Sequence, residues 1–332
     1  MIGLLAATMS CSKGRRKNDV LIPEAATTKE TALVDTGDSA QGVFSPDGSH
    51  LLFISRERKT HAHYQVYEKD LRSGDETRIT FQNGDTYFPR YHPKEPWILY
   101  SSSTDELKEN PPLLQASKEP QKIPESFQQP VELYMHSLKD FQILRLTERT
   151  GFDGEARFTP DGSGLTWTRA KDQHTEVVTM KRGAKIPQAV KGLGPNPSQF
   201  TSSKDGKWRA WVDADETFGV PKLKIQNGKK SAVELTPDMV VPKTDLIFSP
   251  DSKYLLWSQL DMNTGTYQIW AADLEKACAQ RVTLNGKGEG DRRYPALSPD
   301  LKTLAYTSTE KKRSRIMQLS WTAPSASCAG TP

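Results

Sequence analysis

The sequence has few of the residues that build covalent or metal-held folds. Only three cysteines, Cys11, Cys278 and Cys328, occur among its 332 residues. No Cys-x-x-Cys pair and no Cys/His spacing suited to zinc is present, so we expect no metal site of these types. His61 and His63 alternate within the basic stretch RERKTHAH, in which the one carboxylate is Glu57, between two arginines. We interpret them as solvated loop residues.

Further absences exclude whole classes of function. No run of eighteen apolar residues occurs, so nothing after the N-terminus is long enough to span a bilayer. The net charge of +4 is small and the charges of both signs are interspersed, which argues against a nucleic-acid partner. No nucleophile elbow, phosphate-binding loop or dinucleotide fingerprint is present, and the glycine-rich GKGEGD has the wrong spacing. We therefore expect no cofactor and assign no catalytic residue.

What the sequence does contain is a repeat. A turn between two apolar segments occurs six times, as FSPDGSHLLFIS, YHPKEPWILYSS, FTPDGSGLTWTR, SSKDGKWRAWVD, FSPDSKYLLWSQ and LSPDLKTLAYTS. We call the position of the turn proline the anchor; the anchors are Pro46, Pro93, Pro160, Lys204, Pro250 and Pro299. Seven residues after each anchor stands an aromatic residue, in order Phe53, Tyr100, Trp167, Trp211, Trp257 and Tyr306. These six are predicted to form the core between repeats.

The spacing of the anchors identifies the architecture. Four of the five steps are 44 to 49 residues long, which is the length of a four-stranded propeller blade. Alternating apolar residues and β-branched or aromatic enrichment predict strands throughout. The aspartates that follow the anchors are interpreted as turn residues; they are Asp47, Asp161, Asp205, Asp251 and Asp300. The sequence predicts an all-β, six-bladed propeller of antiparallel blades.

A glycine register predicts how the ring closes. Gly37, Gly84, Gly151 and Gly290 each lie nine residues before an anchor, after the fourth strand of the preceding unit. The segment before Gly37 therefore reads as a fourth strand without a blade of its own, whereas the last unit lacks one. We expect 31–34 to complete blade six, which removes the exposed sheet edges.

These motifs resemble the TolB-type repeat, a WD40-like Pro-Asp propeller repeat with a Ser-Pro-Asp-Gly turn, a Tyr-x-x-Asp strand and a Leu-Thr strand. The resemblance covers roughly residues 30–322. Units two and four depart from it, with Lys94-Glu95 in place of Asp-Gly and Lys204 in place of proline. Similar blades occur in periplasmic accessory proteins, peptidases and lyases, so the resemblance specifies fold more than function.

Three segments fall outside the repeat. Residues 1–29 contain a short apolar run ending at Ser10-Cys11, which resembles a lipoprotein signal with lipidation at Cys11, followed by a polar tether. Residues 104–130, rich in proline and charge, are expected to form a long loop between the second and third strands of blade two. Residues 323–332 form a C-terminal tail. Cys278 and Cys328 are placed near one another, on the face that carries the turns, and an oxidising envelope would allow a disulfide there.

Two positions on each innermost strand predict the surface of the central channel. Neither carries a histidine in any unit, although lyases with similar propellers use a histidine-rich channel site. We expect a partner-binding channel mouth, on the same face as the 104–130 loop, formed by Gln41, Phe88, Arg90, Glu155, Arg157, Gln199, Asp245 and Tyr294.

The leading hypothesis is a non-enzymatic module of the bacterial cell envelope that binds a protein or peptide, as the resemblance to TolB implies. It would be periplasmic and anchored to the outer membrane through the lipid at Cys11. One alternative is a propeller lyase or hydrolase with its site in the channel. Another is a structural subunit of a larger envelope machine. The sequence does not determine an oligomeric state.

Overall fold

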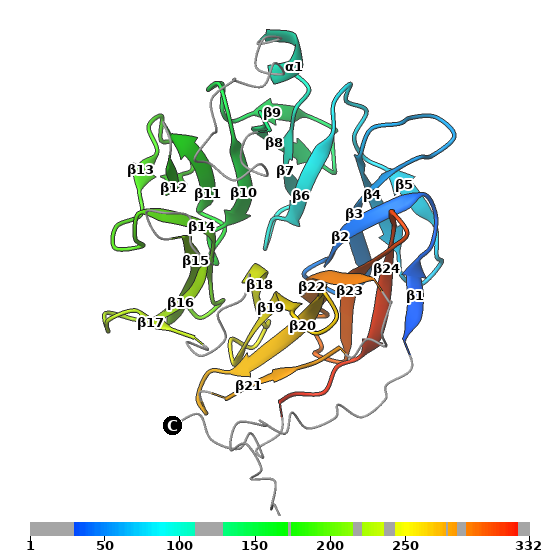
Figure 1. Ribbon diagram of the computed structural model, residues 1–332. Coiled ribbons are helices and arrows are strands. Elements are labelled where there is room, and N and C mark those ends of the chain that lie inside the picture. Colours follow the sequence, from blue (N-terminus) through cyan, green and yellow to red (C-terminus); the bar gives the residue numbers. More distant parts are fainter. Residues whose placement is uncertain are drawn as a thin grey trace, which may run out of the picture.

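The computed structural model describes residues 30–109, 129–171, 174–214, 221–235, 243–276, 278–283 and 290–324. These residues form six four-stranded antiparallel sheets arranged around a central axis, as Figure 1 shows. The expected six-bladed propeller is confirmed. Within the described ranges the one α-helix is α1 (Glu106–Glu109).

Each blade runs outward from an innermost strand. Blade one comprises β2 (Asp38–Phe44), β3 (His50–Arg56), β4 (Gln65–Asp70) and β5 (Glu76–Arg78). Blade two comprises β6 (Thr86–Tyr91), β7 (Trp97–Ser102), β8 (Glu132–Ser137) and β9 (Ile143–Arg145). Blade three comprises β10 (Asp153–Phe158), β11 (Gly164–Lys171), β12 (His174–Lys181) and β13 (Gln188–Ala189). Blades four and five comprise β14 (Asn196–Ser202), β15 (Trp208–Ala214), β16 (Lys222–Asn227) and β17 (Val233–Glu234); and β18 (Lys243–Phe248), β19 (Tyr254–Asp261), β20 (Thr266–Asp273) and β21 (Cys278–Arg281).

Blade six is assembled from both ends of the propeller. Its first three strands are β22 (Asp291–Leu297), β23 (Thr303–Glu310) and β24 (Arg313–Ser320), and its outer strand is β1 (Thr31–Val34). The predicted closing strand is thus confirmed with its bounds. Gly37 follows β1 with φ +63°, and a Cβ there would lie 2.6 Å from the carbonyl oxygen of Arg56, so only glycine fits this turn.

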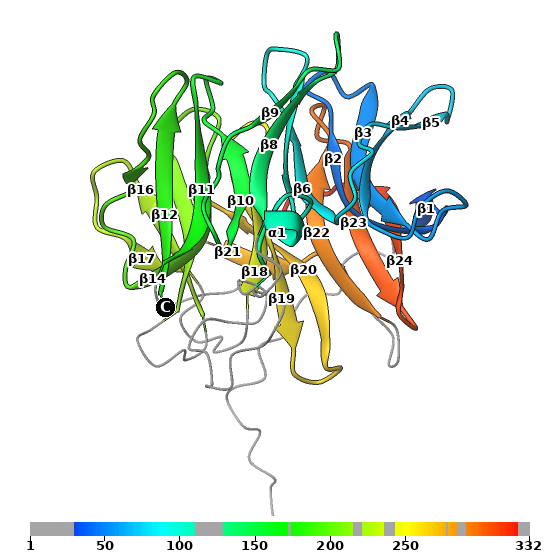
Figure 2. The same ribbon diagram turned by 90° about the horizontal axis from the view of Figure 1, so that it is seen from above.

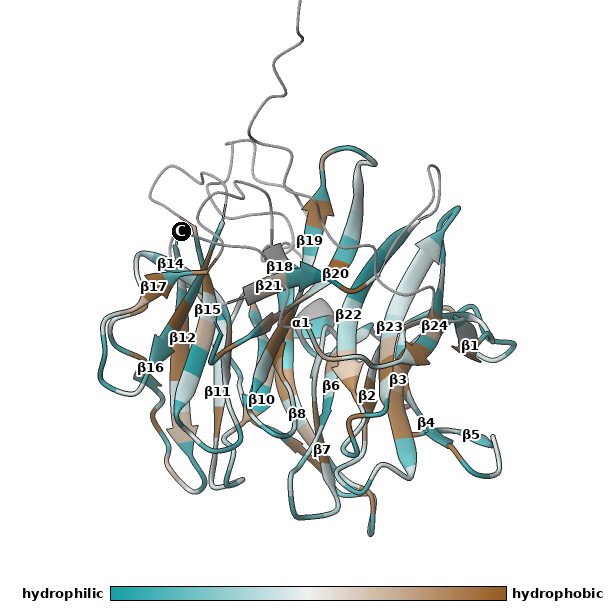
Figure 3. Ribbon diagram, turned by 90° about the horizontal axis from the view of Figure 1, so that it is seen from below, coloured by the Kyte–Doolittle hydropathy of each residue, from teal (hydrophilic) through white to brown (hydrophobic). Residues whose placement is uncertain are grey.

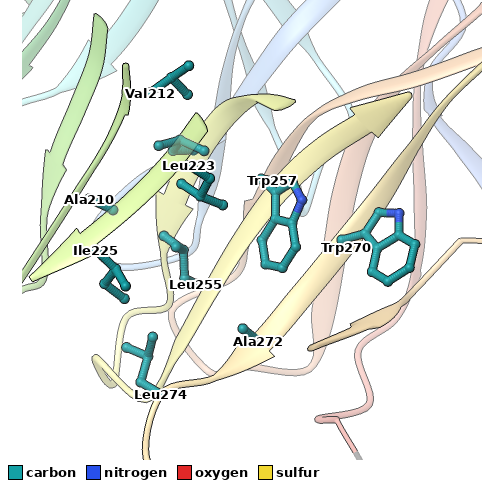
Figure 4. Packing of buried hydrophobic residues seen from close by; sticks show 10 residues of the cluster. Ala210, Val212, Leu223, Ile225, Leu255, Trp257, Trp270, Ala272 and Leu274 are labelled. Carbon is teal, nitrogen blue, oxygen red and sulfur yellow. The ribbon is translucent and has the colours of Figure 1, made fainter. Parts of the chain in front are cut away.

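The six aromatic residues of the repeat are buried, as predicted. Their exposed fractions do not exceed the 3% of Trp167, and Phe53, Tyr100 and Trp257 are fully buried. Figure 4 shows Trp257 of blade five on the side of Leu223 and Ile225 of blade four, with Trp270 on its other side. The core therefore lies between blades. In Figure 3 brown, apolar segments lie along strands such as β3 and β12.

The turns at the anchors follow one hydrogen-bond scheme. In blade one Ser45 Oγ donates to Asp47 at 2.6 Å and accepts from the backbone nitrogen of His50 at 2.9 Å. The interpretation of the aspartates as turn residues is confirmed, because the same two bonds recur around Asp161, Asp205, Asp251 and Asp300. In blade two His92 stands in the place of the serine or threonine, and its Nδ1 accepts from the backbone nitrogens of Lys94 and Glu95 at 3.1 and 2.8 Å.

The strands run roughly along the ring axis in the side view of Figure 2, so each blade presents two ends. The anchor turns lie at one end, which we call the turn face. The connection between β7 and β8, which contains α1, lies at the other end, the insertion face. Most of the predicted 104–130 loop and all of 1–29 lie outside the described residues. Among the described residues no helix is long and apolar enough to cross a membrane.

Candidate functional site: the central cavity

All six innermost strands carry a β-bulge at the same place. In blade one the register shifts so that Gln41 and Gly42 together oppose Phe53. The first residue of each bulge has φ between 53° and 59°; these residues are Gln41, Phe88, Glu155, Gln199, Asp245 and Tyr294. The left-handed conformation costs about 1 kcal/mol or more for a side chain with a Cβ, so the surroundings must hold it.

Hydrogen bonds between neighbouring blades hold several of these bulges. Gln41 Oε1 accepts from the backbone nitrogen of Phe88 at 2.6 Å, and Glu155 Oε2 accepts from that of Gln199 at 2.8 Å. Gln199 accepts in the same way from Asp245, which in turn accepts from the nitrogen of Tyr294 at 3.3 Å. Phe88 has no side-chain acceptor and cannot continue the series. The polar bulge residues therefore tie one blade to the next.

The two carboxylates at this level are already engaged. Asp245 accepts hydrogen bonds from both Nε and Nη2 of Arg293, at 3.0 and 3.1 Å. Glu155 accepts from Thr168 Oγ1 at 2.8 Å as well as from Gln199, and burial raises its pKa. Asp245 is thus paired with a cation, whereas Glu155 is bonded only by neutral donors and its charge favours the cationic form of Arg157.

Arg90 and Arg157 occupy equivalent positions in blades two and three, three residues before their anchors. Arg157 Nη2 donates to the carbonyl oxygen of Leu246 at 2.6 Å, and Arg90 Nη1 donates to that of Pro89 at 2.8 Å. In the part of the chain that the structure describes, no carboxylate oxygen lies within 4.0 Å of either guanidinium. Burial lowers the pKa of Arg90 to about 9 and that of Arg157 to about 10, and the charge of Arg157 contributes to the change at Arg90. Both remain cationic at neutral pH.

These residues surround a central cavity of about 390 Å³. The structure brings all eight predicted channel residues into its lining. On β2 the lining begins at Gln41 and continues to Pro46, and the anchors of the other five turns line it too. Because Pro46 and Pro160 are exposed, the cavity reaches the surface at the turn face.

This position differs from the sequence-based expectation, which placed the mouth at the insertion face. The lining contains no residue that precedes the bulge on an innermost strand, because the linked bulge residues lie across its inner end. The eight residues predicted to surround the channel do line this cavity, which opens at the turn face; their part in binding a partner stays a prediction.

The aromatic wall near the mouth was missed. Phe44, Tyr91, Phe158 and Phe248 each stand two residues before an anchor and line the cavity, together with Leu297 at the equivalent place in blade six. The signal was available, because these residues open the repeated turn motif itself. The other missed residue is Arg293, whose pairing with Asp245 joins residues 48 positions apart.

The remaining candidates lie elsewhere. His61 Nδ1 donates to the carbonyl oxygen of His63 at 2.7 Å, and Nε2 is bonded to the hydroxyl of Tyr67 at 2.6 Å, so His61 is less solvated than expected. Cys11, Cys328 and the side chain of Cys278 are outside the described residues. Among the residues described, no three His, Cys, Asp or Glu side chains are grouped so that they could hold a metal ion.

No protein-family model matches the chain, and no curated protein matches its sequence. Solved structures do match its fold. TolB from Acinetobacter baumannii aligns with a TM-score of 0.59 and 21% identity over 78% of this chain, but over only 56% of its own. A putative TolB from Agrobacterium tumefaciens aligns with a TM-score of 0.58 and 13% identity, over 86% of this chain and 91% of its own. An oligogalacturonate lyase from Vibrio parahaemolyticus gives 0.57 and 13%, over 87% and 79%.

These likenesses, together with the six blades, confirm the resemblance stated from the repeat: the chain is a TolB-type propeller in its fold. Proteins with very different printed functions share this fold, so the function has to be argued from the cavity.

Proposed function

We propose that this protein is a non-enzymatic interaction module of the bacterial cell envelope that binds a protein or peptide in its central cavity. One observation carries the proposal: the cavity combines two unpaired guanidinium groups with an aromatic wall, and it is open at the turn face. Rigid strands hold these groups, so binding requires little ordering of the site. The TolB-type fold supports a partner in the envelope and a periplasmic location.

The anchoring of the module is part of the same proposal. A lipid on Cys11 would attach the propeller to the outer membrane through the polar tether that follows. Such attachment would leave the cavity in the periplasm, where a membrane-associated partner is within reach.

The likeness to an oligogalacturonate lyase favours a second candidate, an enzyme whose site is the same cavity. The third candidate function is that of a structural subunit in a larger envelope machine, in which the partner would stay bound at the cavity permanently. Purified protein incubated with polygalacturonate distinguishes the enzyme, because a lyase releases unsaturated products that absorb ultraviolet light.

Site-specific photocrosslinking in the native envelope tests the binding role. A photoreactive residue replaces Lys204, an exposed residue at the cavity mouth, and in a matched variant it replaces Glu57, which is exposed at the insertion face. We expect a discrete crosslinked partner with the first variant and none with the second. Crosslinks from Glu57 alone, or turnover of polygalacturonate, would contradict the proposal.

A further inference from the structure

Arg90 and Arg157 have donor groups without acceptors. Each guanidinium makes one hydrogen bond, to a backbone carbonyl, and the Nε of Arg157 is buried without any partner in the described structure. Asp245 is paired with Arg293, and Glu155 accepts hydrogen bonds only from the neutral Thr168 and Gln199, so its charge acts on Arg157 without a direct ion pair. The three arginines Arg90, Arg157 and Arg293 against the two acids Glu155 and Asp245 leave an excess of positive charge in the hollow.

This arrangement is unfavourable while the cavity is empty of anions. Both arginines are half-buried, which disfavours their charged forms, and the charge of Arg157 further lowers the pKa of Arg90. An anion placed between them would gain charge-assisted hydrogen bonds from two planar donors without new ordering of the site. The pair has the properties of an anion-binding site.

The wall around the pair limits what the rest of the ligand can be. At the level of the arginines the other blades contribute Val43, Thr201, Ile247 and Ala296. Towards the mouth the aromatic rings and prolines stand beside Ser45, Thr159, Ser202, Lys204 and Ser249. The hydroxyl groups of Ser45, Thr159 and Ser249 are already bonded to the aspartates of their turns, so an oligosaccharide acid would find few partners for its own hydroxyl groups. A free phosphate would leave the apolar wall unused.

From this geometry we propose that the cavity takes a carboxylate of a peptide, either its C-terminus or an acidic side chain, which enters from the turn face and binds between Arg90 and Arg157. Its apolar body packs against Phe158 and Phe248. The inference rests on the proposed function and names the chemistry that the partner presents.

A pair of small probes tests the carboxylate directly. N-acetylphenylalanine carries a carboxylate and an aromatic ring, whereas N-acetylphenylalaninamide has the same shape without the charge. Arginine side-chain N–H signals are followed by NMR in the full chain during titration with each probe. We expect saturable shifts at Arg90 and Arg157 with the acid, at least about tenfold weaker binding of the amide, and weakening of acid binding by salt.

Variants assign the effect to the two residues. Arg90→Gln and Arg157→Gln should each weaken the acid about tenfold or more, while Arg182→Gln, which changes an exposed arginine paired with Glu95, should leave binding unchanged. Near-ultraviolet circular dichroism checks that the fold persists. If a variant does not fold, the comparison of acid with amide on the unaltered protein still decides the matter.

The remaining outcomes separate this inference from the proposed function. Equal binding of acid and amide, or tighter binding of inorganic phosphate or trigalacturonate, would overturn the peptide carboxylate. If the crosslink from position 204 persists in both glutamine variants, the proposed interaction module is retained, but the arginines do not bind the partner. Binding of the acid without any crosslinked partner would retain the carboxylate site and contradict the interaction module.

Discussion

Asp38 Oδ1 accepts a hydrogen bond of 2.8 Å from the backbone nitrogen of Ser314, a residue 276 positions later in the chain. Its other oxygen accepts from Tyr64 and Arg56 at 2.6 and 2.7 Å. Although burial acts in the opposite direction, these bonds hold the pKa of Asp38 below its ordinary value. Together with the pairing of β1 and β24, this carboxylate joins blade one to blade six and closes the ring.

Deleting residues 1–36 should sharply lower the melting temperature. The deletion removes β1, leaves β24 as an exposed edge and takes the buried Val34 away from Ile316. A loss of more than about 3 kcal/mol is expected from the lost burial and strand hydrogen bonds. Calorimetry compares it with deletion of 1–29 alone, which retains the strand. Identical melting of the two truncated proteins would show that β1 does not close the ring.

Truncating a repeat aromatic should destabilise the protein severely. Trp257→Ala empties a fully buried site between blades four and five and should cost about 3–5 kcal/mol. Phe81→Ala serves as the control, because that ring is 73% exposed. Urea unfolding measures both. Similar small losses in the two variants would mean that the register assigned to the blades is wrong.

Asp153 should weaken the fold as pH rises. Burial raises its pKa to about 6 from an ordinary 3.8, although Trp167 Nε1 donates to it at 2.8 Å. The folded state thus favours the protonated acid. The contribution of Asp153 to stability is therefore largest below pH 4, falls by about 2–3 kcal/mol as the pH rises to 6 and is constant above it. Asp153→Asn should therefore stabilise the protein at pH 7.5 and change it little at pH 4.

The matched substitution Asp38→Asn should change the stability in the opposite direction. Asp38 has a lowered pKa, so its contribution is present at neutral pH and is lost on acidification; Asp38→Asn should destabilise the protein at pH 7.5. Urea titrations at both pH values separate the two cases. If Asp153→Asn is neutral or destabilising at pH 7.5, its carboxyl is not held protonated by burial.

The pairing of Cys278 and Cys328 remains a prediction. The backbone of Cys278 begins β21, opposite Asp273, whereas Cys328 lies outside the described residues. Mass spectrometry of peptides prepared without reductant should detect the linked pair in protein isolated from an oxidising compartment. Two free thiols would rule the bond out.

The repeat predicted features that depend on one blade at a time. The anchors, the aromatic core residues and the bounds of β1 all follow from local periodicity, because every blade packs against its neighbour with the same residue types at the same positions. The burial of Trp211 in unit four, where Lys204 replaces the anchor proline, shows that the aromatic position carries more of the pattern than the turn.

Features that join two blades were not predictable in this way. The left-handed bulges carry Gln, Phe, Glu, Asp and Tyr, none of which indicates positive φ as glycine would. Contacts such as Gln41 with Phe88 and Arg293 with Asp245 form only when neighbouring blades pack against each other. The lining of the cavity stops at these bulges, so its opening at the turn face could not be derived from the repeat alone.

The last prediction concerns the face that binds the partner. Reversing the cationic charge with Arg90→Glu and Arg157→Glu places two acids beside Glu155 and Asp245, which should abolish capture of the partner from the envelope. Lys204→Glu at the mouth should weaken capture by a smaller amount, because an exposed charge mainly changes the rate of encounter. Removing residues 106–128 should leave capture unchanged, because that segment joins β7 and β8 at the opposite end of the blade.

Capture is measured by crosslinking in cells, with the melting temperature of each variant as the control for folding. The three changes act at the inner end of the cavity, at its mouth and at the insertion face, so their pattern identifies the surface used. If deletion of 106–128 abolishes capture while both charge reversals retain it, the partner binds the insertion face. The unpaired arginines would then have no part in recognition, and their position in the cavity would require another ligand.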